Sequence, residues 1–276
     1  MTDKGSLLIS CANYNTIDKL VSFLESIVRA YRNADIERLD VLIGDNSDEF
    51  KSLPESFQKQ GFNIYHIDNK KNLGYLGGIA QAIKKKGIDI SNYSYFIISN
   101  VDVTVSEDFF SELMKLERSD DVGWIAPSII SEKENRDRNP KIVHRPSLKK
   151  MEITILFFRY PLLHYLYERV FYRIRKKKQA ANLVSANIYA GHGSFMIFTS
   201  NFTQKHKEID FPSFLFGEEI YFAELILQSK LTARYTPALK IKDFDHASTS
   251  KLGRTSYYKM NYNSMKCLTD LFFRDE

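Results

Sequence analysis

The chain has 276 residues, enough for one large α/β domain or two small ones, and 43% of them are hydrophobic, which is typical of a globular protein with a sizeable core. Its two cysteines, Cys11 and Cys267, exclude a disulfide framework and a cysteine-based zinc site. The formal net charge of +5 suits anionic partners such as phosphates, nucleic acid or acidic lipid headgroups, and does not choose among them.

The first half of the chain alternates predicted strands and helices. Residues 6–12 are a short apolar run followed by turn formers, which predicts a buried strand. Apolar residues then recur along one helical face, so residues 15–32 are predicted as an amphipathic helix with Asn15 or Thr16 at its N-cap. Further strands are predicted at 40–45, 63–67, 94–99 and 122–126, and further helices at 74–86 and about 107–118.

This order of elements predicts an α/β fold with a Rossmann-like, mostly parallel central sheet and helices on both faces. In such sheets ligands bind at the carboxyl ends of the strands. Polar clusters follow three of the predicted strands, at residues 13–15, 45–47 and 100–102. We therefore expect the functional site at this edge of the sheet.

The second half of the chain follows a different pattern. It begins with a charged loop at 131–141, and the segment 151–178 is aromatic and basic. A strand at 193–198, a helix at about 218–229 and short strands near 233–243 come next. No linker separates the halves, so we expect a single domain over 1–276, with one half at 1–127 and the other at 128–276.

Two polar clusters have the chemistry of a ligand site, and each also fits a simpler role. Asp102, after the strand 94–99, could hold Mg²⁺ or Mn²⁺ against a diphosphate, since these ions accept one or two carboxylates and phosphate oxygens. Asp45 and its neighbours could bind a base edge or a ribose hydroxyl. Both clusters could equally be turns or caps, where Asp and Asn are favoured.

Three later features also carry chemistry. The glycine-containing stretch 72–78 opens a helix and permits close backbone approach, although a plain helix start fits it equally well. Glu218 and Glu219 follow an aromatic turn and could supply a general base. Alternatively, they could be present only because glutamate stabilises the N-terminus of a helix. His246 could bind a metal such as Mn²⁺, or lie on the surface.

Seven of these fragments, in the same order, resemble glycosyltransferase family 2, which has the GT-A fold. The similarity is strongest to the branch of bacterial rhamnosyltransferase-like enzymes that build capsules and O-antigens. It runs from about Leu7 to Ser250 and rests on YN, DNS, NLGYLGG, NVDV, GHGSFMIF, FLFGEE and DHASTS.

The resemblance implies an inverting glycosyltransferase that moves a sugar from a nucleoside diphosphate, dTDP or UDP, to a saccharide acceptor that is lipid-linked. It also implies that residues 1–127 are the nucleotide-sugar-binding half and residues 128–276 the acceptor-side half. It implies a divalent cation, Mn²⁺ or Mg²⁺, held by Asp102 and His246, with Glu219 as the catalytic base beside Glu218. The positions that match the family's nucleotide and donor site are Asn13, Tyr14, Asp45, Asn46, Ser47, Asn72, Gly74, Gly78, Asn100 and Asp102.

The chain departs from the family pattern at three positions. Asn100 replaces the first aspartate of the DXD-type motif, which puts tight metal binding in doubt. Glu219 stands where aspartate is common, and Tyr221 where an acidic residue is common, so a donor or acceptor preference does not transfer.

The segment 151–178 also predicts contact with a membrane surface. An apolar stripe between Leu163 and Ile174 has basic residues beside it and ends in the basic run 175–178, which is typical of an interfacial helix. A helix packed on the core fits this pattern as well. Because no signal-peptide core and no run of about 18 charge-poor apolar residues is present, we expect a cytoplasmic protein, peripheral at the inner membrane surface.

Three other functions fit less well. A nucleic-acid-binding protein would need basic residues spread along one face, and here they are local, so we expect no nucleic-acid partner. A nucleotidyltransferase would show a glycine-rich basic loop after the first strand, where this chain has CANYNT. A sugar-nucleotide-binding protein that has lost activity is favoured only by Asn100.

Overall fold

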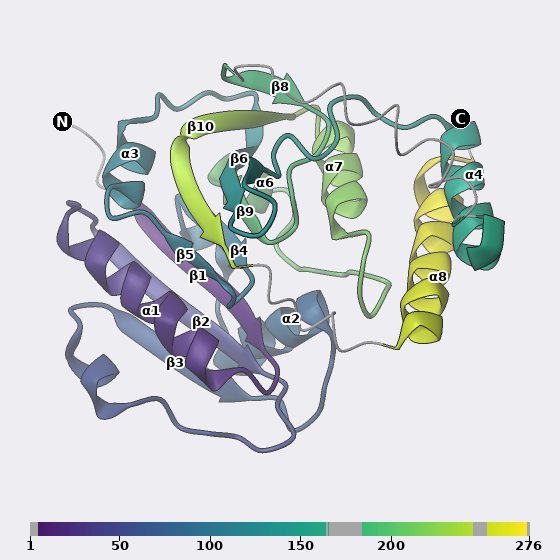
Figure 1. Cartoon of the computed structure of the whole chain (residues 1–276). Helices are drawn as coiled ribbons and strands as arrows, with labels where there is room; N and C mark the ends of the chain where they lie inside the picture. The colour runs from purple at the N-terminus through teal and green to yellow at the C-terminus, as the bar shows by residue number, and fades with distance from the viewer. Residues whose placement is uncertain (1–4, 164, 166–183, 245–252, 275–276) are drawn as a thin grey trace.

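The computed structural model describes residues 5–163, 165, 184–244 and 253–274, and the fold is built on one mixed sheet (Figure 1). Ten strands of the described chain belong to it, and the longest path of neighbours runs β3-β2-β1-β4-β9-β6-β10-β5. Four strands at one side are parallel and confirm the predicted ones: β1 (Ser6–Asn13), β2 (Arg38–Asp45), β3 (Asn63–Asp68) and β4 (Tyr95–Ser99).

The other side of the sheet mixes strand directions. Strand β9 (Phe195–Thr199) lies between β4 and β6 (Val122–Ser131) and is antiparallel to both. The short strands expected near 233–243 form one strand, β10 (Thr232–Asp243), whose pairing with β6 is interrupted between Thr236 and Lys240. Shorter strands at the edges are β5 (Val103–Val105), β7 (Arg136–Asp137) and β8 (Ala186–Ile188).

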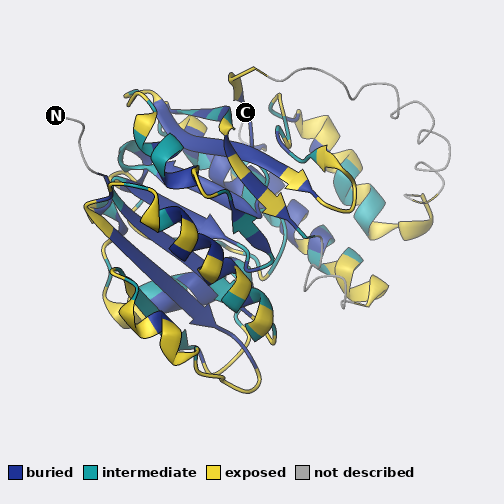
Figure 2. Cartoon of the chain, turned by 60° about the vertical axis from the view of Figure 1, so that its left-hand side comes forward, coloured by how far each residue is buried: buried dark blue, intermediate teal, exposed yellow. Residues whose placement is uncertain are grey.

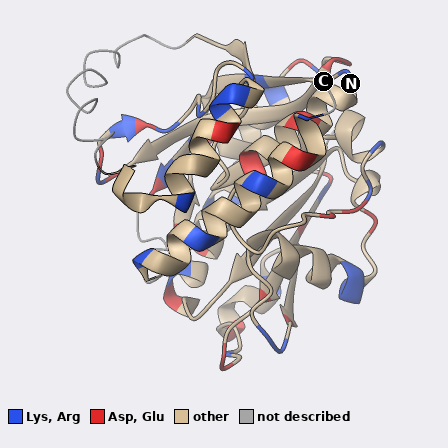
Figure 3. Cartoon of the chain, turned by 90° about the vertical axis from the view of Figure 1, so that its right-hand side faces the viewer, with Lys and Arg blue, Asp and Glu red and all other residues tan. Residues whose placement is uncertain are grey.

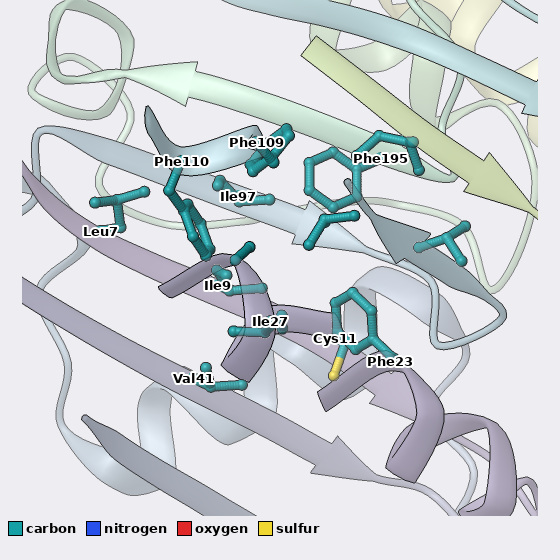
Figure 4. Packing of buried hydrophobic residues seen from close by; sticks show 14 of the residues in the cluster. Leu7, Ile9, Cys11, Phe23, Ile27, Val41, Ile97, Phe109, Phe110 and Phe195 are labelled. Carbon is teal, nitrogen blue, oxygen red and sulfur yellow. The ribbon is translucent and has the colours of Figure 1, made fainter. Parts of the chain in front are cut away.

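Two hydrophobic clusters, one on each face of the sheet, hold the helices in place. In β1, Leu7, Ile9 and Cys11 belong to one cluster and Leu8 to the other, as the alternation of side chains along a strand requires. Figure 4 shows the first cluster, where Phe23 of α1 packs among the strand residues. The predicted helices on both faces of the sheet are thus confirmed: α1 (Ile17–Arg32) and α3 (Phe109–Lys115) belong to the first cluster, α2 (Tyr75–Lys86) and α7 (Glu218–Gln228) to the second. In Figure 2 the strands are largely buried, whereas the helices show exposed outer faces.

Two helices outside these layers pack side by side, α4 (Leu148–Arg159) and α8 (Arg254–Phe272) (Figure 1). The sequence analysis did not identify α8. Its buried positions include Asn261, Ser264 and Thr269, so its core-facing side lacks the apolar periodicity that reveals α1. The remaining short helices of the described chain are η1 (Glu55–Lys59), η2 (Ile90–Asn92) and α6 (Ser200–Thr203).

Two local expectations differ from the structure. Thr16 precedes α1 but its hydroxyl does not cap the helix; it donates to Asn13 Oδ1 at 2.9 Å. Helix α3 is shorter than predicted, because Leu116 is already extended.

The predicted interfacial helix lies mostly outside the described residues, since 164 and 166–183 are not among them. None of the described helices combines the length and the apolar character needed to cross a bilayer.

Candidate active site

A cavity of about 630 Å³ lies where the sequence predicts it, beyond the carboxyl ends of β1, β2 and β4. The residues that directly follow these strands contribute to its lining, and α7 contributes its first turn. The predicted site residues that line the cavity are Tyr14, Asn46, Asn72, Gly74, Asn100, Asp102, Glu218 and Glu219. Four others, Asn13, Asp45, Ser47 and Gly78, are not part of this lining. His246 lies outside the described residues.

Asp45 is buried behind the cavity wall, where it accepts several hydrogen bonds. Asn13 Nδ2 donates to Oδ2 at 2.9 Å, His66 Nε2 lies 2.7 Å from the same oxygen, and the Ser47 backbone N–H donates to Oδ1 at 2.8 Å. Burial alone would raise the pKa of Asp45, but the hydrogen bonds from His66, Ser47 and Asn13 outweigh it and lower the pKa to about 2. With 1% of its surface exposed, Asp45 holds the ends of β1 and β2 together and leaves Tyr14 and Asn46 to face the cavity.

Glycines bring the start of α2 against the neighbouring loops. Gly74 has φ +77°, and a Cβ placed on it would lie 2.0 Å from the carbonyl oxygen of Phe214. A Cβ on Gly78 would lie 2.5 Å from Nδ2 of Asn46, which donates to the carbonyl of Gly74 at 2.8 Å. The glycines predicted from 72–78 therefore permit close packing of the cavity wall, and the loop before α7 depends on the position of Gly74.

Glu218 and Glu219 both lie against Gly193. The Gly193 backbone N–H donates to Glu219 Oε1 at 3.3 Å, and a Cβ on Gly193 would lie 2.5 Å from Glu218 Oε1. Tyr75 fixes the same residue from the other side, since its hydroxyl donates to the Gly193 carbonyl at 3.0 Å. Burial and the negative charge of Glu219 raise the pKa of Glu218 to about 8. At neutral pH Glu218 therefore carries a proton, and the pair presents a single negative charge.

Asp102 provides the carboxylate that suits a cation. Burial and the negative charge of Asp243 raise the pKa of Asp102, while Asp243 itself is paired with Arg138 Nη1 at 2.8 Å. Asp102 is partly exposed to the cavity, and a cation beside it would relieve the repulsion from Asp243. Mg²⁺ or Mn²⁺ needs only one or two carboxylates when phosphate oxygens complete its shell. No cluster of three or more His, Cys, Asp or Glu able to enclose an ion occurs within the described ranges, and the other predicted metal ligand, His246, lies outside them.

His192 is a cavity residue to which the sequence analysis assigned no role. Its Nδ1 accepts from the Ser194 backbone N–H at 3.1 Å, which places the ring proton on Nε2. Burial and the positive charges of Lys141 and Arg138 lower its pKa well below the ordinary range. His192 is thus a neutral hydrogen-bond donor, and the only sequence signal for it is the pair of flanking glycines in GHGS.

Other cavity residues come from parts of the chain to which the sequence assigned no site. Among them are Lys19, Lys141, Tyr257 and Asn261. Lys141 lies in the predicted charged loop, and Tyr257 and Asn261 belong to the unpredicted helix α8. Their approach to the cavity depends on tertiary packing.

Comparison with known proteins agrees with this geometry. A model of the family described as glycosyl transferase family 2 matches residues 6–200. No curated protein sequence is similar enough to this chain to count as a match. The expected GT-A fold is confirmed, because the sheet, its flanking helices and the family match agree with solved glycosyltransferase structures.

Two solved structures illustrate the shared fold. One is a crystal structure of GalNAc-T7 with UDP, GalNAc and Mn²⁺, at a TM-score of 0.60 and 10% identity over 96% of this chain and 48% of that one. The other is a crystal structure of TarS from S. aureus, at a TM-score of 0.54 and 9% identity over 98% of this chain and 44% of that one. The chain therefore spans about half the length of either structure. At these sequence identities the similarity to the two solved structures concerns the fold alone. The family model matches residues 6–200 of the sequence itself, and the chain therefore belongs to glycosyl transferase family 2.

Proposed function

We propose that this chain is an inverting, metal-assisted glycosyltransferase that moves a sugar from a nucleoside diphosphate to a hydroxyl group of a saccharide acceptor. The observation that carries the proposal is one cavity that is lined by the carboxylate of Asp102 and by a carboxylate pair, Glu218 and Glu219. Donor binding and acceptor activation need these two kinds of group in one place.

In this proposal Glu219 removes the proton from the acceptor hydroxyl as that oxygen attacks the anomeric carbon. The Gly193 N–H orients Glu219, and Glu218 retains its own proton, so the pair does not place two negative charges beside a diphosphate. The Nε2–H of His192 and the side chains of Asn46 and Asn72 are available to hydrogen-bond the donor. A single displacement of this kind inverts the anomeric centre.

Asp102 would hold the divalent cation, and the predicted second ligand, His246, lies outside the described residues. When bound, the cation neutralises the charge that develops on the leaving nucleoside diphosphate. Asn100 lines the cavity beside Asp102 and offers an amide where a second carboxylate would bind more tightly. This arrangement supports weak metal binding that strengthens once the diphosphate is present.

The donor we propose is a sugar linked to UDP or dTDP. UDP is present in the GalNAc-T7 structure, and the ordered fragments of the sequence resemble the rhamnosyltransferase-like branch. The same resemblance supports a role in the synthesis of capsule or O-antigen polysaccharide.

A lipid-linked acceptor at the inner membrane surface also belongs to the proposal. Helix α4 buries only Met151 among its residues, and it exposes Ile153 and Leu156 by 42% and 45%. An exposed apolar helix face beside a basic segment suits binding to anionic lipid. The basic run 175–178 lies outside the described residues.

The test is release of nucleoside diphosphate from a panel of UDP-, dTDP- and GDP-linked sugars, each incubated with the protein, Mn²⁺ and an extract of membrane lipids. Release that requires the extract and falls at least about 100-fold in Glu219→Gln supports the proposal. A protein that binds a nucleotide sugar but turns over none of them would favour the alternative of a family member that binds without catalysis.

A further inference from the structure

A second, larger cavity lies between α4 and α8. It has a volume of about 930 Å³. The two helices belong to the side of the molecule that faces the viewer in Figure 3. We call this cavity the α4/α8 groove. The described residues that line it are Phe158, Arg159, Pro161, Leu162, Tyr165, Arg254, Thr255, Tyr258, Lys259 and Tyr262.

Aromatic rings form the walls of the groove. Tyr258 and Tyr262 are four residues apart and share one face of α8, and Phe158 lies opposite, with its ring centroid 6.1 Å from that of Tyr258. Tyr165 extends the wall and is 48% exposed. Tyrosine combines a flat apolar face with a polar hydroxyl, which matches a sugar ring with its apolar C–H face and its hydroxyl edge.

All the charged residues among the described lining of the groove are basic. Arg159 comes from the end of α4, and Arg254 and Lys259 come from the first turns of α8. None of these three forms an ion pair with a residue that the structure describes. Arg159 lies over the Tyr160 ring at 5.6 Å and Arg254 over the Tyr258 ring at 6.0 Å, contacts that leave their positive charges without a carboxylate partner among the described residues. Exposed cations collected along a groove attract an anionic ligand.

The groove adjoins the active-site cavity. Phe158 lines both, and the adjacent residues Tyr257 and Tyr258 line the active site and the groove respectively. A molecule whose end lies near Glu219 could therefore extend along α8 without leaving the protein surface. Because Glu219 is the proposed base for the acceptor hydroxyl, a molecule that extends from Glu219 along α8 would be the acceptor.

We propose that the α4/α8 groove binds the acceptor, and that this acceptor is an anionic saccharide. Its sugar rings stack on Tyr258 and Tyr262, and its negative groups pair with Arg254 and Lys259. This inference rests on the proposed function, because it assigns the terminal hydroxyl of the same molecule to Glu219. The concave shape and the wall shared with the active site favour a saccharide chain over a flat lipid surface as the occupant.

The test uses the full-length protein and two anionic tetrasaccharides, tetragalacturonate and a heparin-derived one, with neutral maltotetraose for comparison. Calorimetric titration at low salt measures the dissociation constant for the wild type, for Tyr258→Ala and for Arg254→Gln/Lys259→Gln. The matched control is Lys266→Gln, on the same helix but paired with Asp270 and outside the groove. Titration with UDP and Mn²⁺ on every variant reports the donor site separately.

We expect at least one anionic tetrasaccharide to bind more tightly than maltotetraose. The dissociation constant should rise about fivefold in Tyr258→Ala and about tenfold in the double variant, with Lys266→Gln and all UDP titrations unchanged. Failure of both anionic tetrasaccharides to bind, or equal binding by the groove variants, would overturn the inference. If vesicles of phosphatidylglycerol bind in a manner that needs Arg254 and Lys259 while the saccharides do not bind, the groove is a membrane contact and the inference is wrong. Failure of the wild type to bind UDP would instead count against the proposed function.

Discussion

Replacing Glu218 with glutamine should remove a pH-dependent loss of stability. Burial and the charge of Glu219 raise the pKa of Glu218 from 4.5 to about 8, so the folded protein prefers the protonated carboxyl group. The stability that this preference contributes is fully present below pH 4.5 and is lost as the pH rises through 8. Glutamine, which is uncharged at every pH, keeps the shape of the protonated form.

The size of the effect follows from the shift. The full shift corresponds to about 5 kcal/mol, of which about 3 kcal/mol is lost between pH 6 and pH 9, and solvent at the cavity mouth reduces this figure. Thermal unfolding at pH 6 and pH 9 measures this loss of stability as a drop in Tm. The drop should be several degrees larger in the wild type than in Glu218→Gln. Glu112→Gln, which removes an exposed carboxylate paired with Lys115, serves as the control for general charge effects. Equal pH dependence in the wild type and Glu218→Gln would refute the assignment of the proton to Glu218.

Three further changes test other parts of the structure. Glu219→Gln should lower kcat by about 100-fold or more with little change in donor affinity, because it removes the proposed catalytic base. A variant that loses donor affinity but keeps a normal kcat would contradict the role of Glu219 as the base. The stability advantage of the wild type over Asp45→Asn should shrink by about 2 kcal/mol as the pH falls from 6 to 2. The lowered pKa of Asp45 stabilises the fold fully above its ordinary value of 3.8, and this stabilisation is lost as the pH falls towards the folded value of about 2. Denaturant titrations at several pH values measure this, and a constant difference would be inconsistent with it. Arg145→Met should lower the free energy of unfolding by about 3–5 kcal/mol, because it leaves the buried Glu224, which is 3% exposed, without its cation. Urea unfolding measures this change, and a value below about 1 kcal/mol would show that the ion pair contributes little to stability.

Much of the fold could be predicted because its signals are local. The helix α1 has a clear apolar stripe, and the strands β1, β2 and β4 are apolar runs that end at polar clusters. The direction of β9 could not be predicted in this way, since an apolar run is the same in parallel and antiparallel strands and only the pairing with β4 and β6 decides it.

The candidate site was predictable where a residue type and its position at a strand end were sufficient. Asp102, just beyond the end of β4, lines the cavity as that logic suggests, whereas Glu219 lines it from the first turn of α7. Asp45 shows the limit, because its partner His66 lies 21 residues away in sequence and nothing local reveals that the pair is buried. Tyr257 and Asn261 were missed because their helix, α8, places polar residues against the core.

The most direct test of the account is calorimetric titration of the purified protein with UDP, dTDP and GDP, each with and without Mn²⁺. We predict micromolar binding of UDP or dTDP that weakens at least about tenfold when the ion is removed with EDTA, and by a similar factor in Asp102→Ala. The control variant Asp108→Ala, whose carboxylate is outside the cavity, should bind as the wild type does. Binding that is indifferent to both the ion and Asp102 would contradict the metal-assisted mechanism, and no binding of any nucleotide would contradict the proposed function itself.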